Sequence, residues 1–293
     1  MKIVLKKHKS LALVLIALFT FSTSCIEDIT NEIKLDSTYV RLVVDGSIST
    51  DTTRHKVILS KSGSAIGTDS VQFISNAKVT ISDGIIMYNL SENLSRKGTY
   101  ETDSSVFGIP GRTYTLKISN VDVNNDGVME EYTASSLLRP ENKIDSVKIL
   151  SENTEGGKFW IIDLYALDNG AKNNNYLMKV IKNNVLLTDS AFELVNIGNN
   201  TGFEGKYYSG FPVYGLNSNK PDERLKQGDT VTLEMDGITE DYAKYLNAFI
   251  AEYYPKIPMF SGPSANIPTN VVPGDKAVGF FAAYSVVRKS VKY

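Results

Sequence analysis

The chain has one cysteine and two histidines among its 293 residues, and these shortages exclude several kinds of chemistry. One cysteine cannot form an internal disulfide, and zinc sites built from cysteine and histidine need three or four such ligands. Ser-His-Asp catalysis would need His55, which lies in a polar run where we expect a solvated hairpin. No GxGxxG, Walker, GxSxG or HExxH pattern occurs. We therefore expect no enzyme, although carboxylate-pair chemistry needs no histidine and stays open.

After the first 24 residues, acidic side chains outnumber basic ones. Those residues hold four lysines and no acid, so residues 25–293 carry 27 basic and 33 acidic side chains and a formal net charge of −6. Nucleic acids and anionic membrane surfaces require a basic patch, so this balance argues against both as partners. After residue 24, no apolar run approaches the length of a membrane span.

The N-terminal segment has the features of a bacterial lipoprotein export signal. A lysine-rich start precedes an apolar stretch, Leu11 to Phe21, and three small residues directly before Cys25. This stretch is too short to span a membrane as a helix. We expect residues 1–24 to be a signal peptide and residues 25–37 a tether lipidated at Cys25, with a plain secretory cleavage site as the alternative. We therefore expect the protein to be exported and then anchored to a membrane by lipid.

Period-2 alternation of apolar and polar residues dominates residues 38–138. Clear examples run from Val40 to Val44, from Ala77 to Ile81 and from Tyr114 to Ile118, separated by turns rich in Gly, Asn, Asp and Ser. Several such strands at short spacing, with no helical period between them, indicate an antiparallel β-sandwich. The first domain is therefore expected to be a sandwich over residues 38–138.

A second β-rich domain is expected over residues 139–293, after the boundary at Arg139-Pro140-Glu141-Asn142. The run from Phe159 to Tyr165 is apolar on both faces and predicts a strand in the middle of a sheet. Residues 189–228 have weak periodicity and predict long loops. One amphipathic helix is expected at about 239–254, capped by Thr239 and packed through its aromatic face. The predicted fold class is thus mainly all-β, with two β domains and one helix.

Short motifs follow one another in a characteristic order along the chain. In chain order they are Cys25 followed by acids, Leu42–Gly46, Asn76–Gly84, Gly98–Tyr100, Pro110–Leu116, Asn175–Tyr176, the helix with Tyr242–Leu246, Asn266–Ile267 and Gly279–Val286. This order resembles a lipoprotein family of the Bacteroidota known as domain of unknown function 4249. The resemblance spans nearly the whole chain after the signal segment.

The resemblance implies an outer-membrane lipoprotein of a kind often found beside TonB-dependent receptors, with no catalytic residues to carry over. The first domain also resembles the immunoglobulin-like or transthyretin-like modules attached to such receptors, and Glu27 and Asp28 resemble the surface-export signals of Bacteroidota lipoproteins. We expect a non-enzymatic accessory or interaction component of a TonB-dependent transport system. The alternatives are a surface protein that binds a glycan or peptide and a carboxylate-dependent surface hydrolase.

A candidate metal site lies in the hairpin after Ile118, which reads D-x-N-x-D-G from Asp122 to Gly127. In calcium loops, oxygens at alternate positions converge on the cation and the glycine permits a sharp turn. The calcium ligands would be Asp122, Asn124, Asp126, the carbonyl of Val128 and Glu130. Thr133 stands where an EF-hand has its bidentate glutamate, so a plain solvated turn is the other interpretation. No further cofactor is expected.

A candidate binding loop lies between Gly205 and Tyr214. Its aromatic residues are Tyr207, Tyr208, Phe211 and Tyr214. Exposed tyrosines on glycine-rich loops stack on sugars or anchor a protein partner. The alternative is that they cover the edge of a small sheet.

Overall fold

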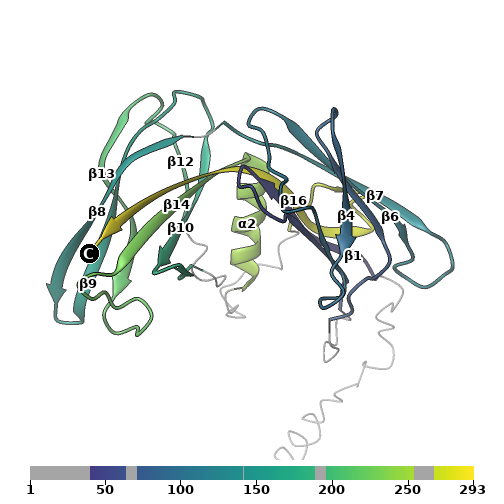
Figure 1. Ribbon diagram of the computed structural model, residues 1–293, viewed down its shortest axis with the longest axis horizontal. Helices are drawn as coiled ribbons and strands as arrows, with labels where there is room; N and C mark the ends of the chain where they lie inside the picture. The colour runs from purple at the N-terminus through teal and green to yellow at the C-terminus, as the bar shows by residue number, and fades with distance from the viewer. Residues whose placement is uncertain (1–39, 64–70, 141, 189–195, 254–266) are drawn as a thin grey trace, which may run out of the picture. The chain divides into compact units, whose positions relative to one another are not determined.

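The computed structural model describes residues 40–63, 71–140, 142–188, 196–253 and 267–293. These residues belong to one unit, Tyr39–Tyr293. The expected signal peptide, the tether and Cys25 lie outside the described residues. The fold is mainly β, as the alternation predicts, and many of its strands are labelled in Figure 1.

The first part of the chain forms a β-sandwich. Its strands are β1 (Leu42–Ser49), β2 (Lys56–Lys61), β3 (Lys78–Ser82), β4 (Met87–Glu92), β5 (Thr99–Glu101), β6 (Thr113–Val121) and β7 (Glu130–Leu137). β1, β2 and β5 pair side by side, as do β3, β6 and β7, and β4 joins the two groups by pairing with both β3 and β5. The alternating apolar residues of both groups meet in one core, in which Val44 and Leu59 pack with Leu116 and other buried side chains.

The second part of the chain forms two further layers. Its elements are β8 (Lys143–Thr154), β9 (Gly157–Leu167), β10 (Asn175–Lys182), β11 (Val185–Leu186), β12 (Ile197–Asn199), β13 (Tyr207–Asn217) and β14 (Thr230–Ile238). β9 lies between β13 and β8 in a separate sheet, which confirms the central strand predicted from its two-sided apolar run. This sheet packs on β10 and β14 through a second core that includes Ile162, Trp160, Val180 and Leu233.

The last strand, β16 (Ala277–Lys292), serves both parts of the chain (Figure 1). Its first half pairs in parallel with β1, beginning with Ala277 opposite Leu42. Its second half pairs antiparallel with β14. Together with β15 (Val271–Val272), which pairs with β7, it brings C-terminal residues such as Phe281 into the first core. The chain therefore divides into two parts near residue 139, but β16 returns from the end of the second part and pairs with strands of both.

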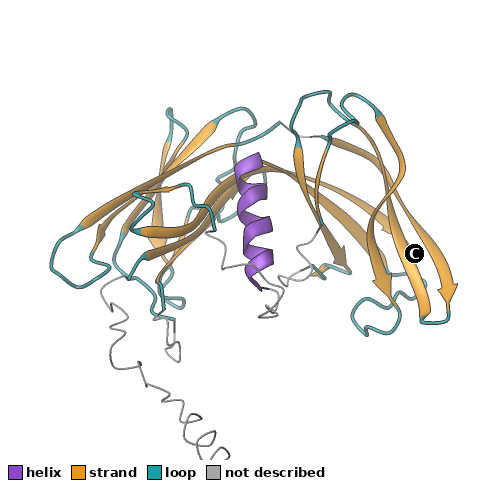
Figure 2. Ribbon diagram, turned by 180° about the vertical axis from the view of Figure 1, so that it is seen from behind, coloured by secondary structure: helices purple, strands orange, loops and turns teal. Residues whose placement is uncertain are grey.

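The predicted helix is α2 (Glu240–Tyr253), shown beside the strands in Figure 2. The Thr239 hydroxyl oxygen accepts a hydrogen bond from the Tyr242 backbone N–H at 3.2 Å, which satisfies one of the unpaired donors at the helix start. Ala243 and Leu246 pack against Leu177 and Ile238, on the face of the sheet opposite the second core. Among the described residues, no helix combines the length and apolar character that crossing a membrane requires.

The aromatic face of α2 is buried only in part. Tyr242 and Tyr245 each lie 5.1 Å from Phe280, measured between ring centroids, and are half-buried. Phe249 is 38% exposed and Tyr253 53% exposed. The expectation that the whole aromatic face packs on the sheet was wrong for these two residues, because Ala243, Leu246 and Ile250 provide the buried face.

Candidate functional site

A cavity of about 110 Å³ opens between the two layers of the second part of the chain; it is named here the Phe203 pocket. One wall comes from β9 and β13 and carries Leu164, Ala166, Tyr208 and Phe211. The strand register explains this grouping, because Tyr208 lies opposite Ala166 and Phe211 lies opposite Leu164. Directly opposed residues of antiparallel strands point to the same face. All four side chains therefore face the space between the layers.

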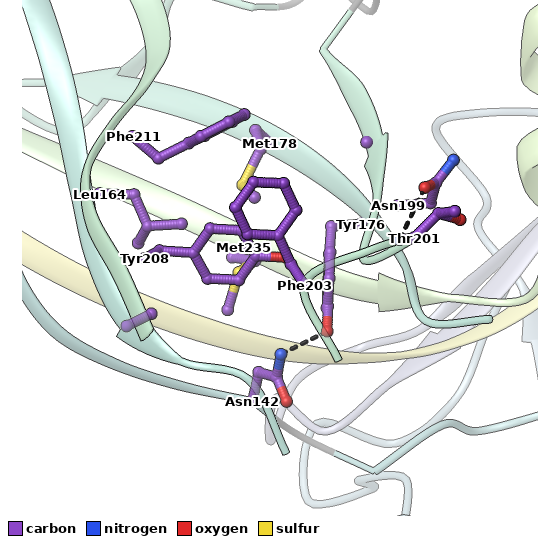
Figure 3. Close-up of a pocket in the computed structure, with 12 residues that line it drawn as sticks. Asn142, Leu164, Tyr176, Met178, Asn199, Thr201, Phe203, Tyr208, Phe211 and Met235 are labelled. Atoms are coloured by element: carbon purple, nitrogen blue, oxygen red, sulfur yellow. Dashed lines mark hydrogen bonds between the residues drawn. The ribbon is translucent and has the colours of Figure 1, made fainter. Parts of the chain in front are cut away.

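The other wall comes from β10, β12 and β14. Tyr176 and Met178 alternate along β10 and point to the same face. Gly198 lies opposite Tyr176, and Met235 lies opposite Met178. Figure 3 shows the two thioethers and the aromatic rings converging on one space. Methionine adapts its shape readily and makes favourable contacts with aromatic rings.

Three aromatic rings close one side of the pocket. Phe203 stacks on Tyr208 with ring centroids 5.1 Å apart and an interplanar angle of 16°. Phe211 meets Tyr208 edge-on at 5.7 Å and Phe203 edge-on at 6.2 Å. Phe203 is 40% exposed and Phe211 44% exposed, whereas Tyr208 is buried. The aromatic cluster thus reaches from the core to solvent, and it forms the mouth of the pocket.

A bulge in β13 places Phe211 in the pocket. In an unbroken strand, residues three apart point to opposite faces, so Tyr208 and Phe211 could not line one wall. The register shifts between Ser209 and Phe211, and Gly210 has a φ of 73°. This extra residue turns Phe211 to the same face as Tyr208. The expectation of long loops over residues 189–228 was wrong for Tyr207–Asn217, which form β13. The bulge interrupts the alternation of side chains between the two faces, so the sequence does not show the period of two that is typical of a strand.

The predicted aromatic loop is thus divided between different surroundings. Tyr208 and Phe211 line the pocket. Tyr214 packs on the second core. Tyr207 lies opposite Leu167, and both are at least half exposed on the outer face, at 50% and 55%. Sequence reasoning missed Phe203, although an aromatic residue between Gly202 and Gly205 in a polar run is the same kind of signal.

A buried polar cluster supports the pocket from behind. Asn142 and Tyr176 both line the pocket; the Asn142 side-chain amide donates to the Tyr176 hydroxyl, and Tyr176 donates to Asp168 at 3.1 Å. Asp168 is 3% exposed and accepts further hydrogen bonds from the backbone N–H groups of Gly170 and Gly205 and from the Asn200 side chain. Because Asn200 and Gly205 flank Phe203 in the chain, Asp168 positions the turn that carries this ring.

The electrostatics of this cluster keep Asp168 ionised and Tyr176 protonated. Burial by itself would raise the pKa of Asp168, but hydrogen bonds from Gly205, Gly170, Asn200 and Tyr176 outweigh burial and lower it. Burial raises the pKa of Tyr176, and the neighbouring charge of Asp168 raises it further. The carboxylate is thus saturated with donors and serves as a structural acceptor.

A separate cluster of charges lies on the face of the sheet that α2 covers. Lys179 Nζ lies 3.0 Å from a Glu234 oxygen and 2.5 Å from an Asp236 oxygen. Arg288 of β16 pairs with the second oxygen of Glu234 and with both oxygens of Asp51. The Glu234 and Asp236 side chains are 8% and 1% exposed. Cations thus neutralise this carboxylate pair away from the Phe203 pocket.

The predicted calcium loop is closed by its own hydrogen bonds. The Asp122 carboxylate accepts from the backbone N–H groups of Asp126 and Gly127, and Asp126 accepts from Val128 and from the Asn124 amide. Glu130 accepts from the Tyr132 hydroxyl and from Lys276. In the part of the chain that the structure describes, no group of three or more His, Cys, Asp or Glu side chains is arranged to hold a metal ion. Calcium would have to compete with these contacts, and calcium binding here stays a prediction.

His55 is buried, with 4% of its surface exposed. The Ser49 backbone N–H donates to its Nδ1 at 3.4 Å, and its Nε2 lies 3.1 Å from the Val106 carbonyl oxygen. This pairing places the proton on Nε2. Burial lowers the pKa of His55. The expected solvated position was wrong for this side chain, because the imidazole is buried and both of its ring nitrogens pair with backbone groups.

Comparison with known protein families identifies the class of this protein. The family model described as domain of unknown function (DUF4249) matches residues 27–290. The chain belongs to this family, which confirms the family predicted from the order of its motifs. No curated protein matches the chain.

Proposed function

We propose that this protein is a lipid-anchored binding protein of the outer membrane that captures a small ligand in the Phe203 pocket. The observation that carries the proposal is the pocket itself, a concave apolar space with a few polar groups at its margin. Preformed sites of this composition are typical of small-molecule binding. The partly exposed rings of Phe203 and Phe211 give a ligand access from solvent. The export signal and Cys25 support the location.

Ligand capture is compatible with the accessory role that the family resemblance implies. A lipid anchor holds a binding protein close to receptors in the same membrane, which raises its effective concentration there. We propose that the protein collects its ligand beside a TonB-dependent receptor. The receptor is then the macromolecular partner of this protein, and the ligand held in the pocket is supplied to the receptor.

The proposed activity is binding without turnover. Asp168, which accepts a hydrogen bond from the pocket-lining Tyr176, is buried and accepts hydrogen bonds from several other donors, so it is poorly suited to act as an acid, base or nucleophile. Glu234 and Asp236 are paired with Lys179 and Arg288. Glycosidase-type hydrolysis requires two carboxyl groups on either side of the substrate. These surroundings favour the binding alternative over the hydrolase.

Two experiments test the two parts of the proposal. A thermal-shift screen of small apolar, peptide and glycan ligands should find at least one that raises the melting temperature of the wild type, since a ligand of the native state stabilises it. Crosslinking and pull-down from outer membranes should recover a TonB-dependent receptor with the wild type and less with Cys25→Ala. If no ligand class stabilises the protein, the binding function fails. If anchored wild type recovers no receptor, the accessory role fails.

A further inference from the structure

We infer that the Phe203 pocket binds one small apolar group, a single aromatic ring or a short branched alkyl chain, and that a glycan is not its ligand. The inference rests on the proposed binding function and specifies the chemistry of the ligand. The group can belong to a free small molecule or to the side chain of a peptide.

The composition of the walls is the first argument. Leu164, Ala166, Met178 and Met235 present hydrocarbon and thioether surfaces, and the rings of Phe203 and Phe211 add aromatic faces. Burying such surfaces against an apolar ligand is favourable by about 25 cal/mol per Å². A sugar hydroxyl placed against these surfaces would lose its hydrogen bonds to water and gain none.

The state of the polar groups is the second argument. The Tyr176 hydroxyl and the Asn142 amide nitrogen, which lie at the wall, are already bonded to each other, and Tyr176 is bonded to Asp168. Asp168 itself is saturated by backbone and side-chain donors. A glycan would have to displace these bonds, and any buried polar group left unpaired would weaken its binding. Asn142 Oδ1 is the exception, since it is buried without a hydrogen-bond partner. One free acceptor is too few for a hydroxyl-rich ligand, so the polar cluster mainly holds the pocket together.

The size of the pocket is the third argument. Its volume of about 110 Å³ is somewhat below the roughly 150 Å³ of an apolar cavity known to bind benzene. This volume leaves room for at most one ring and none for two. Any larger ligand must extend past the exposed rings of Phe203 and Phe211, where Asn199 and Thr201 offer polar side chains.

Methionine methyl groups provide a direct probe of the pocket. Met178 and Met235 line it, whereas Met87 and Met129 are exposed elsewhere at 63% and 61% and serve as internal controls. The full-length protein, carrying ¹³C-methyl methionine in lipid nanodiscs, is titrated with benzyl alcohol, N-acetylphenylalanine amide and methyl glucoside. Benzyl alcohol should shift the Met178 and Met235 signals and leave the other two in place. A response to the phenylalanine amide as well would identify a peptide side chain as a source of the group.

A variant that fills the pocket checks that the shifts report binding there. A Cβ on Gly198 meets no atom within 4 Å, and its position opposite Tyr176 directs it to the pocket face. Gly198→Leu should weaken benzyl alcohol binding by at least about tenfold, or 1.4 kcal/mol. Gly215→Leu is the matched control, because a Cβ on Gly215 of β13 also meets open space and this residue does not line the pocket.

The possible outcomes separate this inference from the proposed function. Shifts of Met178 and Met235 with methyl glucoside but not with benzyl alcohol would overturn the apolar assignment and leave a binding function intact. Equal binding of benzyl alcohol by wild type and Gly198→Leu would also overturn it, because the probe would then bind elsewhere. An absence of response to all three probes, joined to a failed thermal-shift screen, would overturn both the inference and the proposed function.

Discussion

Gly279 of β16 lies so close to Val44 of β1 that a Cβ on Gly279 would stand 2.0 Å from the Val44 carbonyl oxygen. Gly279 also has a φ of 91°, which L side chains rarely adopt. The two residues are direct partners in the parallel pairing that joins the end of the described chain to its first strand. Any side chain at position 279 would therefore clash with the backbone of Val44.

Gly279→Ala should therefore destabilise the fold by on the order of 2–4 kcal/mol, since β1 and β16 must separate to admit the methyl group. Urea unfolding followed by circular dichroism measures this loss. Gly84→Ala is the control, because Gly84 has a similar φ of 85° but open space around its Cβ position. Similar losses in both variants would show that backbone conformation, and not the close approach to Val44, sets the cost.

The Asp168 cluster should make stability depend on pH in acid. Hydrogen bonds lower the pKa of Asp168 in the folded protein below its ordinary value of 3.8. The stabilisation is therefore complete above that value and is lost as pH falls below it, because the unfolded chain then binds more protons. Comparing unfolding free energies from pH 6 to pH 2 for wild type and Asp168→Asn isolates this contribution.

Asp168→Asn should also cost about 1–3 kcal/mol at neutral pH, since an amide cannot accept all the hydrogen bonds that the carboxylate accepts. It should weaken ligand binding because the turn from Asn200 to Gly205, which carries Phe203, loses its anchor. A variant with unchanged neutral-pH stability and the same acid slope as wild type would contradict this role.

His55 should lower the stability of the protein in mild acid. Burial lowers its folded-state pKa below the ordinary 6.5. The unfolded chain therefore binds a proton that the native state does not, and the unfolding free energy falls as pH drops below about 6.5. His55→Gln should remove this slope between pH 7 and pH 5. A wild-type imidazole that titrates by NMR at or above 6.5 would refute the assignment.

Lys179→Met should be strongly destabilising, because it leaves Asp236 buried without its cation. Burial already raises the pKa of Asp236, and Lys179 opposes that rise. Breaking a buried ion pair on one side typically costs about 3–5 kcal/mol, and replacing both partners with apolar residues restores much of the loss. We expect Lys179→Met with Asp236→Leu to be more stable than Lys179→Met alone.

The exposed pair between Lys117 and Glu131 provides the control for this prediction. Its side chains are 50% and 64% exposed. Lys117→Met should change the unfolding free energy by less than about 1 kcal/mol. If Lys179→Met is no more costly than Lys117→Met, Lys179 does not compensate a buried charge.

The local pattern of the sequence was sufficient to predict several individual elements. Strands such as β1, β3 and β6 follow the alternation of apolar and polar residues, and Thr239 with the acids after it marks the start of α2. The return of β16 to β1 could not be predicted, because Ala277 and Leu42 are far apart in sequence and parallel pairing leaves no local signal. The same holds for the contribution of Phe281 to the first core.

The Phe203 pocket could be predicted only in part. Tyr208 and Phe211 stood out as aromatic residues near glycines, but the bulge at Gly210 that turns both into one wall has no clear signature. Met178 and Met235 looked like ordinary strand residues, and only the pairing of β10 with β14 brings them together. Asn142 marked a boundary in the sequence and proved to lie at the pocket wall.

Whether the Phe203 pocket holds a small ligand can be tested by identifying the compounds that the protein carries when it is purified from the cells that produce it naturally. Wild type, Gly198→Leu and Gly215→Leu are isolated from cells and extracted for mass spectrometry of small molecules. We expect a compound with a small apolar group that accompanies wild type and Gly215→Leu and is depleted from Gly198→Leu. Equal recovery from all three forms, or a hydroxyl-rich glycan that depends on the open pocket, would contradict it.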